Sequence, residues 1–232
     1  MTVPYETAKA ALLEAAMMHV PFDGWSETTF QAAARDADLS PSVARAICPR
    51  GAVDLAIAFH KAADAAMLER LSETDLSALK FRDKVTAAVR IRLEVIEDKE
   101  AVRRGTTLFA LPMYAADGAK LIWGTCDAIW TALGDTSDDV NWYTKRATLS
   151  GVYSSTVLYW LGDDSPDHMA TWGFLDRRIE NVMAIEQVKA KVRQSPTLSR
   201  LMTGPNWVLG QIKAPRSTPK TDLPGSWTAP RE

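Results

Sequence analysis

The stretch GDTSDDVNWYTKRATLSGVYSSTVLYWLGDDSPD, residues 134–167, begins and ends with helix signals. Residues suited to an N-cap precede it, namely Thr136, Ser137 and Asp138, and Thr136 with Asp139 also fits a capping box. Gly162 can end the helix, and Ser165 followed by Pro166 can start the next one. These signals predict a helix of roughly 22 residues, about six turns.

The second part of this helix carries no charge between Ala147 and Gly162. A helix facing solvent would show a polar stripe along its length, so the sequence predicts a central, buried helix. The uncharged run is shorter than the roughly 20 apolar residues that a bilayer span needs. We expect its apolar part to form one wall of a cavity, and its polar, aromatic beginning to form a docking surface.

The rest of the chain predicts an all-α fold, because helix signals recur and no segment alternates with period two. The sequence predicts about ten helices, near residues 4–19, 26–37, 40–48, 51–71, 75–97, 100–111, 116–133, 137–161, 166–191 and 196–212. In the helix near 75–97, one face carries charges, including Arg92, and is expected to be solvated. The helices near 116–133 and 137–161 share a short loop, which predicts antiparallel neighbours.

The first three helices have the layout of a helix-turn-helix, with Ser40 as N-cap and Pro41 as first residue of the third. Their charges argue against DNA binding. Residues 1–50 contain 4 basic and 6 acidic side chains, a balance of −2. Phosphate contacts need Lys and Arg, so we interpret the module as a degenerate scaffold that binds no nucleic acid. A ligand-responsive transcriptional regulator of the TetR type remains the alternative function.

No pattern of catalytic residues is present. His19, His60 and His168 are isolated, and the pair Asp164 and His168 is a poor metal site. Cys48 and Cys126 have no CxxC or Cys/His companions and are expected to be free, buried thiols. The sequence therefore predicts a binding protein without catalytic residues, metal or cofactor. Its first residues lack a targeting signal, which predicts that it stays where it is made.

The segment from Val188 to Thr221 contains seven basic residues and no acidic one. Within it a helix over Pro196–Ile212 would place apolar residues on one side, namely Leu198, Leu201, Met202, Trp207, Val208, Leu209 and Ile212. Basic charge beside an apolar face with a Trp is typical of an interfacial membrane helix. The alternative is a helix that packs on its own domain. The prolines that follow, at 215, 219, 224 and 230, predict a disordered tail.

The run from Asp127 to Met183 closely resembles the signature of the ubiquinone (coenzyme Q) biosynthesis accessory proteins with a TetR-repressor-like fold. The matching segments are DAIW, GDTSDDVNWYTKRA, GVYSSTVLYWLGDDSPD and TWGFLDRRIENVM, about a quarter of the chain. The resemblance implies a homodimeric accessory protein that engages a membrane, and the lack of catalytic residues agrees with a non-enzymatic role. Because the first residues carry no transit peptide, we expect either a bacterial member, at the inner face of the cytoplasmic membrane, or a trimmed chain. The resemblance further implies an isoprenoid quinone precursor as ligand and the di-iron quinone hydroxylase of the pathway as partner.

The resemblance also assigns a partner-binding patch, made of Asp127, Asp135, Asn141, Trp142, Tyr143 and Arg146. Helical period alone suggests the lipid-binding residues, which are Ile122, Ile129, Val152, Tyr159, Trp160 and Trp172. The expected organisation is a helix-turn-helix module over 1–50, a ligand-binding domain over 51–193, a membrane helix over 194–213 and a disordered tail over 214–232.

Overall fold

The structure is a computed structural model that describes residues 5–194 and 213–215. The described residues contain no strand and fold into ten α-helices and one 3₁₀ helix, which confirms the predicted all-α class. The helices are α1 (Tyr5–Met17), α2 (Val20–Asp23), α3 (Glu27–Asp36), α4 (Pro41–Ile47), α5 (Ala52–Glu73), α6 (Phe81–Glu94), α7 (Lys99–Phe109), α8 (Ala115–Ala132), α9 (Val140–Leu161), η1 (Pro166–His168) and α10 (Met169–Gln194).

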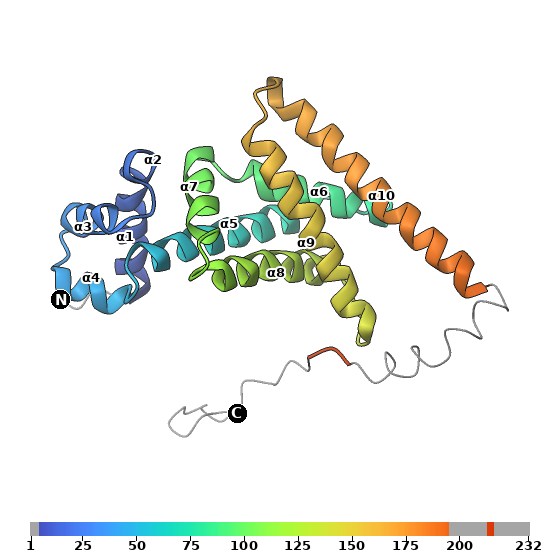
Figure 1. Cartoon of the computed structure of the whole chain (residues 1–232), viewed down its shortest axis with the longest axis horizontal. Coiled ribbons are helices and arrows are strands. Elements are labelled where there is room, and N and C mark those ends of the chain that lie inside the picture. Colours follow the sequence, from blue (N-terminus) through green and yellow to red (C-terminus); the bar gives the residue numbers. More distant parts are fainter. Residues whose placement is uncertain (1–4, 195–212, 216–232) are drawn as a thin grey trace, which may run out of the picture.

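Helices α1–α4 form a small module at one end of the molecule (Figure 1). Ser26 caps α3 by accepting a hydrogen bond from the Thr29 amide, and Ser40 caps α4 in the same way. Asp38 adopts φ 54°, in the left-handed region, where the chain turns between these two helices. Around Leu12, Phe30 and the first turns of α5, the module has its own hydrophobic core. This is the helix-turn-helix that the sequence predicts.

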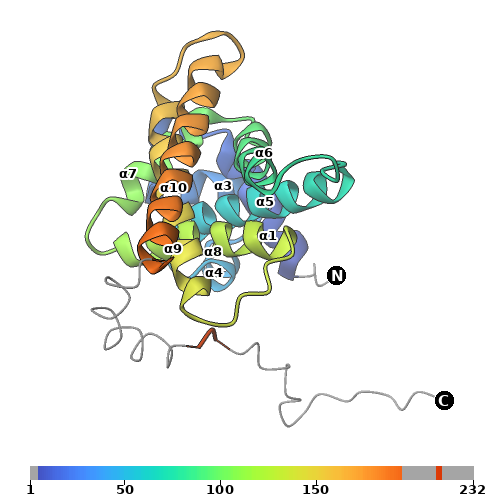
Figure 2. The same cartoon turned by 90° about the vertical axis from the view of Figure 1, so that its right-hand side faces the viewer.

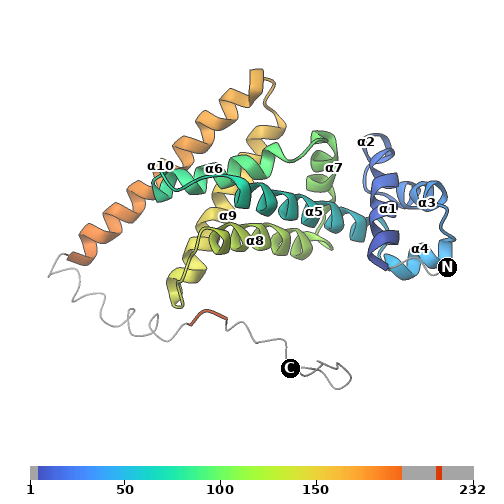
Figure 3. The ribbon, with the colours of Figure 1, turned by 180° about the vertical axis from the view of Figure 1, so that it is seen from behind.

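Helix α5 extends from this module into the larger group of helices (Figures 1 and 3). Its second half packs on α6 and α8, while α9 packs on α8 and α10. A second hydrophobic core lies here, with Met67, Val89, Ile129 and Leu175 among its buried members. The view along the long axis shows α9 and α10 covering the group on one side (Figure 2). Helix α5 therefore belongs to both cores.

Helix α9 is the central helix that the sequence predicts, and Gly162 follows its last residue. Its buried side chains include Leu149, Val152 and Trp160. The N-cap is Asp139, whose carboxylate accepts a hydrogen bond from the Asn141 amide. The helix α9 is adjacent to α8 as expected, but it crosses α8 obliquely instead of running antiparallel to it (Figure 1).

Other boundaries differ from the prediction for local reasons. Helix α6 begins at Phe81 and not near residue 75, because the Asp75 carboxylate accepts the Ser77 amide in a turn of its own. Arg92 was expected on a solvated face but is 1% exposed, since its guanidinium pairs with Asp64. The predicted helix over 196–212, with its proposed membrane residues, lies outside the described residues, as does most of the predicted tail.

None of the helices in the described part of the chain combines the length and the apolar character that a membrane crossing requires.

Candidate functional site

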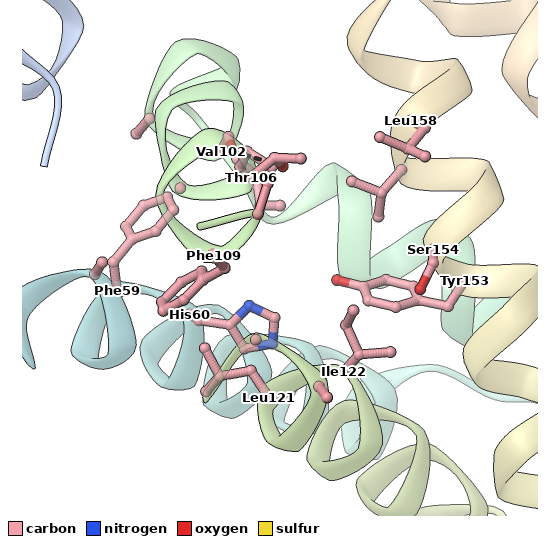
Figure 4. A pocket seen from close by; sticks show the side chains of 18 of the residues that line it. Phe59, His60, Val102, Thr106, Phe109, Leu121, Ile122, Tyr153, Ser154 and Leu158 are labelled. Carbon is pink, nitrogen blue, oxygen red and sulfur yellow. Dashed lines mark hydrogen bonds between the residues drawn. The ribbon is translucent and has the colours of Figure 1, made fainter. Parts of the chain in front are cut away.

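An apolar cavity of about 430 Å³ lies among α5, α6, α7, α8 and α9 (Figure 4). Aromatic and aliphatic side chains make up most of its wall, among them Phe59, Leu93, Phe109, Leu121, Ile122 and Val157. Leu158 also lines the cavity and is 61% exposed, so the cavity reaches the surface beside it. A mostly apolar cavity with few polar groups is typical of a site for a small apolar ligand.

Small residues allow the helices around the cavity to approach one another. A Cβ atom at Gly118 of α8 would lie 2.8 Å from the Cβ of Phe109, so only glycine permits this contact between α7 and α8. On the side of the N-terminal module, Trp25 closes the cavity. Its indole nitrogen donates to the Ala101 carbonyl at 3.0 Å, which fixes the ring against α7. The two modules therefore share the wall of the cavity.

One side of the cavity holds a connected polar cluster of His60, Asp64, Arg92 and Thr125. Arg92 Nε donates to Asp64 Oδ1 at 2.6 Å, and its Nη2 donates to the His60 carbonyl. The Thr125 hydroxyl lies 2.9 Å from the same Asp64 oxygen and 2.8 Å from His60 Nε2. His60 and Asp64 are four residues apart on α5, which places both side chains on one face. The cluster joins α5, α6 and α8.

Burial keeps His60 and Tyr153, two titratable groups at this cavity, uncharged. Desolvation, aided by the positive charge of Arg92, lowers the pKa of His60 to about 4. Desolvation likewise raises the pKa of the Tyr153 phenol to about 12. At neutral pH the imidazole is therefore neutral and the phenol keeps its proton. Both residues line the cavity.

Among the six residues that helical period suggested for the lipid, only Ile122 lines this cavity. Ile129, Val152 and Trp160 are buried in the second hydrophobic core instead. Tyr159 is 39% exposed and stacks on Phe174. Trp172 packs at the edge of the core beneath Arg90. Period alone marks inward-facing positions, and it cannot tell a packed core from the wall of a cavity.

A second feature is an aromatic patch made of Trp123, Trp142 and Tyr143, where α8 meets the beginning of α9. The Trp142 ring centroid lies 5.9 Å from that of Trp123 and 4.8 Å from that of Tyr143. All three rings are partly exposed, and Asn141 beside them is exposed. Clustered, partly exposed aromatic side chains are typical of the centre of a protein interface.

Ion pairs around the buried side chains of Arg146 and Asp135 support the aromatic patch from beneath. Arg146 is 2% exposed and binds Asp127 through Nε at 2.5 Å and Asp135 through Nη1 at 3.0 Å. Lys145 Nζ binds Asp135 at 2.7 Å. Burial would raise the pKa of Asp135, but hydrogen bonds from Lys145, Ser137 and Arg146 lower it to about 2. The cluster links the end of α8 and the following loop to the start of α9.

A short segment near the C-terminus also contacts this region. The Tyr143 hydroxyl donates to the Lys213 carbonyl at 3.3 Å, and the Ala214 amide donates to the Asp138 carbonyl at 2.8 Å. The chain beyond α10 thus returns to the beginning of α9.

The structure brings the six residues predicted for partner binding together around the start of α9, in two layers. Asn141, Trp142 and Tyr143 reach the surface, and the Asp127 side chain is 44% exposed. The side chains of Arg146 and Asp135 are 3% and 2% exposed, so they lie beneath the surface. Sequence reasoning missed His60, Arg92 and Tyr153 at the cavity. The spacing of His60 and Asp64 by four residues was the available signal.

No group of three or more potential ligands that could hold a metal ion occurs within residues 5–194 and 213–215. Asp163 near η1 has a structural role, because it accepts hydrogen bonds from the amide and the hydroxyl of Thr171. These bonds, with those from Ser165, lower the pKa of its carboxyl.

Comparison with known proteins gives a consistent result. The model of the COQ9 family matches residues 115–186. The ubiquinone biosynthesis protein COQ9-A, mitochondrial, of Xenopus laevis is 32% identical over 191 residues, which are 78% of this chain and 59% of that protein. The Drosophila melanogaster COQ9 protein is 31% identical over 188 residues, covering 79% and 57%. The chain spans about three fifths of the length of the curated relatives that it matches.

Among solved structures, a TetR transcriptional regulator from Nitrosomonas europaea is similar to this chain. The TM-score is 0.61 at 17% identity, with 74% of this chain and 95% of that chain covered. This likeness confirms the TetR-like fold that the sequence predicts, and at this identity it concerns the fold alone.

Proposed function

Because the chain belongs to the COQ9 family, we propose that it is a non-enzymatic accessory protein of ubiquinone biosynthesis. In this role it binds an isoprenoid quinone precursor and presents it to the quinone hydroxylase of the pathway at a membrane surface. The observation that carries the proposal is the apolar cavity. The family match over residues 115–186 includes α8 and α9, which form part of the cavity wall.

The lipid-binding part rests on the character of the cavity wall. Its volume of about 430 Å³ falls in the range of ligand sites, and its lining is largely aliphatic and aromatic. Each buried CH₂ group contributes about 0.8 kcal/mol, so a chain of isoprene units would gain affinity from burial alone. The exposed Leu158 marks an opening through which part of a long ligand could extend.

The partner-binding part rests on the aromatic patch. Trp142 and Tyr143 combine partly exposed rings with a base of buried ion pairs, which holds them in one orientation. Rigid aromatic anchors lose little entropy on binding and are enriched in interface hot spots. We assign this patch to the di-iron hydroxylase that the resemblance implies.

The membrane-binding part rests on the sequence of residues 188–221, with seven cations and no acidic residue. Anionic headgroups attract such segments, and each cation contributes about 1 kcal/mol near the surface. We also propose that the chain forms a homodimer. Sedimentation of the full chain at several concentrations measures its oligomeric state and tests this.

A transcriptional regulator is the second candidate, because the fold resembles a TetR regulator. Arg45, the one basic residue of α4, pairs with Glu27 at 2.5 Å and lies over the Phe30 ring. A recognition helix of this kind has little positive charge left for phosphate. A salt-dependent shift of specific duplex DNA would favour the regulator.

The direct experiment for the main proposal is organic extraction of protein purified from a quinone-producing host, followed by mass spectrometry. Recovery of an isoprenoid lipid in amounts comparable to the protein supports lipid binding. Recovery of polar small molecules alone contradicts it.

A further inference from the structure

Two polar side chains project into the cavity from opposite walls, Tyr153 from α9 and His60 from α5 (Figure 4). Tyr153 is 4% exposed and lines the cavity, and within the described residues its hydroxyl takes part in no hydrogen bond. The hydroxyl belongs to a side chain of the cavity wall, where a ligand can reach it. The Tyr153 hydroxyl therefore has an open position for a hydrogen bond with an occupant of the cavity.

The polar cluster fixes which nitrogen of His60 carries the proton. The Asp64 carboxylate, 2.9 Å from the Thr125 hydroxyl, and the Leu121 carbonyl, 3.2 Å from it, only accept hydrogen bonds, so Thr125 directs its proton to these acceptors and not to His60. The Thr125 oxygen is then an acceptor for His60 Nε2, at 2.8 Å. His60 Nε2 consequently carries the proton, and Nδ1 presents a lone pair. Within the described residues no group donates to Nδ1, and the His60 ring projects into the cavity (Figure 4).

Among the polar groups of the cavity wall, the Tyr153 hydroxyl is a neutral donor and His60 Nδ1 a neutral acceptor, while Arg92 Nη1 is a charged donor without a partner in the described residues. The low pKa of His60 keeps its imidazole uncharged, and the phenol of Tyr153 stays protonated. Asp64 compensates the charge of Arg92 at 2.6 Å. An ionised headgroup would have to lose its hydration in this apolar surrounding, and that loss is costly without a counter-ion.

We propose that Tyr153 and His60 together bind a single neutral hydroxyl group on the lipid. The Tyr153 hydroxyl donates to the oxygen of the ligand, and His60 Nδ1 accepts the ligand's proton. This inference rests on the proposed function and deepens it, because it restricts the ligand to lipids with a free hydroxyl, phenolic or aliphatic. The pair sets the position of the headgroup, while the apolar wall holds the chain.

Two isomeric probes test the proposal, octan-1-ol and heptyl methyl ether. They have the same atoms, but the ether has an acceptor and no donor. Isothermal titration of the full chain should show about fivefold tighter binding of the alcohol, because a hydrogen bond contributes about 1 kcal/mol and about 1.4 kcal/mol is needed for a factor of ten. Tyr153→Phe should weaken binding of both probes, and His60→Phe should remove the preference for the alcohol.

Thr107→Val is the matched control. Thr107 lies on α7 outside the cavity wall, and its hydroxyl donates to the Arg103 carbonyl of its own helix at 3.1 Å. Its loss should leave both affinities within twofold of the unmodified chain. Tyr153→Phe removes no hydrogen bond within the described residues, so the variant should fold, as circular dichroism verifies.

Three outcomes would overturn the proposal. If the two isomers bind with equal affinity and Tyr153→Phe does not change either affinity, hydroxyl recognition is refuted, while lipid binding itself is not. Tighter binding of octanoate than of octan-1-ol refutes a neutral ligand and points to an ion pair with Arg92. Failure of every probe to bind, in protein shown by extraction to be free of lipid, contradicts the proposed function as well.

Discussion

The guanidinium carbon of Arg146 lies 4.0 Å from the centroid of the Trp142 ring. Trp142 precedes Arg146 by one turn of α9. The same guanidinium binds Asp127 and Asp135 and donates to the Trp142 carbonyl at 3.1 Å. A cation stacked on an indole face stabilises the ring position, the more so where the cation is desolvated. One buried arginine therefore connects the ion pairs with the exposed aromatic side chains above them.

Arg146→Ala should destabilise the fold by about 3–5 kcal/mol, because it leaves the buried Asp135 carboxylate without this partner. Asp127→Asn should cost less than about 1 kcal/mol, since the Asp127 side chain is 44% exposed and solvent screens its pair. Urea unfolding measures both changes. Equal small losses would show that the ion pairs contribute little to the stability of this region.

Stability should depend on pH through Asp135. Its pKa is about 2 in the folded protein, below the ordinary value of 3.8, so the folded state favours the charged form. The resulting stabilisation is complete above about pH 4 and is lost as the pH falls toward 2. Asp135→Asn should lower the free energy of unfolding by about 1–3 kcal/mol at pH 7. That difference should shrink below pH 4, and a difference independent of pH would contradict the assignment.

Trp142→Ala should weaken binding of the quinone hydroxylase by about 2 kcal/mol or more, as removal of a central aromatic anchor does. Thr148→Ala, exposed on the same helix, is the control and should bind as the unmodified chain does. Surface plasmon resonance with purified hydroxylase measures both. If Trp142→Ala unfolds the protein, the ring is structural. If it folds and binds normally, the docking surface lies elsewhere.

Truncation after Gln194 should abolish binding to anionic liposomes. Screening by salt should weaken binding of the full chain only in part, because apolar burial persists when the charge attraction is lost. Co-flotation at low and high salt measures this. A truncated protein that floats equally well places the membrane contact in another segment. One that aggregates shows that the removed segment covers its own domain.

The sequence was a good guide to helices and a partial guide to the sites. Caps such as Ser26, Ser40 and Gly162 act locally, so they predicted helix ends that the structure confirms. The predicted start of α9 was wrong by a few residues. The Ser137 hydroxyl bonds with Asp135 and Lys145, and Asp139 is the N-cap instead.

Patterns within single helices could not predict which residues line the cavity. Whether Tyr153 or Tyr159 faces it depends on how α9 crosses α8, which no pattern within one helix specifies. Arg92 was placed in solvent because a charged residue usually lies there, and only its partner Asp64 on another helix explains its burial. The grouping of the six predicted patch residues followed from the family resemblance and not from spacing.

The central claim is that this cavity holds the lipid, and lipid occupancy of a cavity-filling variant tests it most directly. Val157 lines the cavity, so Val157→Trp should occupy much of its volume, whereas Thr148→Trp places the same side chain at an exposed site outside it. Mass spectrometry of extracts from proteins purified in parallel measures lipid per chain. We predict at least a fivefold loss for Val157→Trp and none for Thr148→Trp. Equal lipid in the two folded variants would contradict the account.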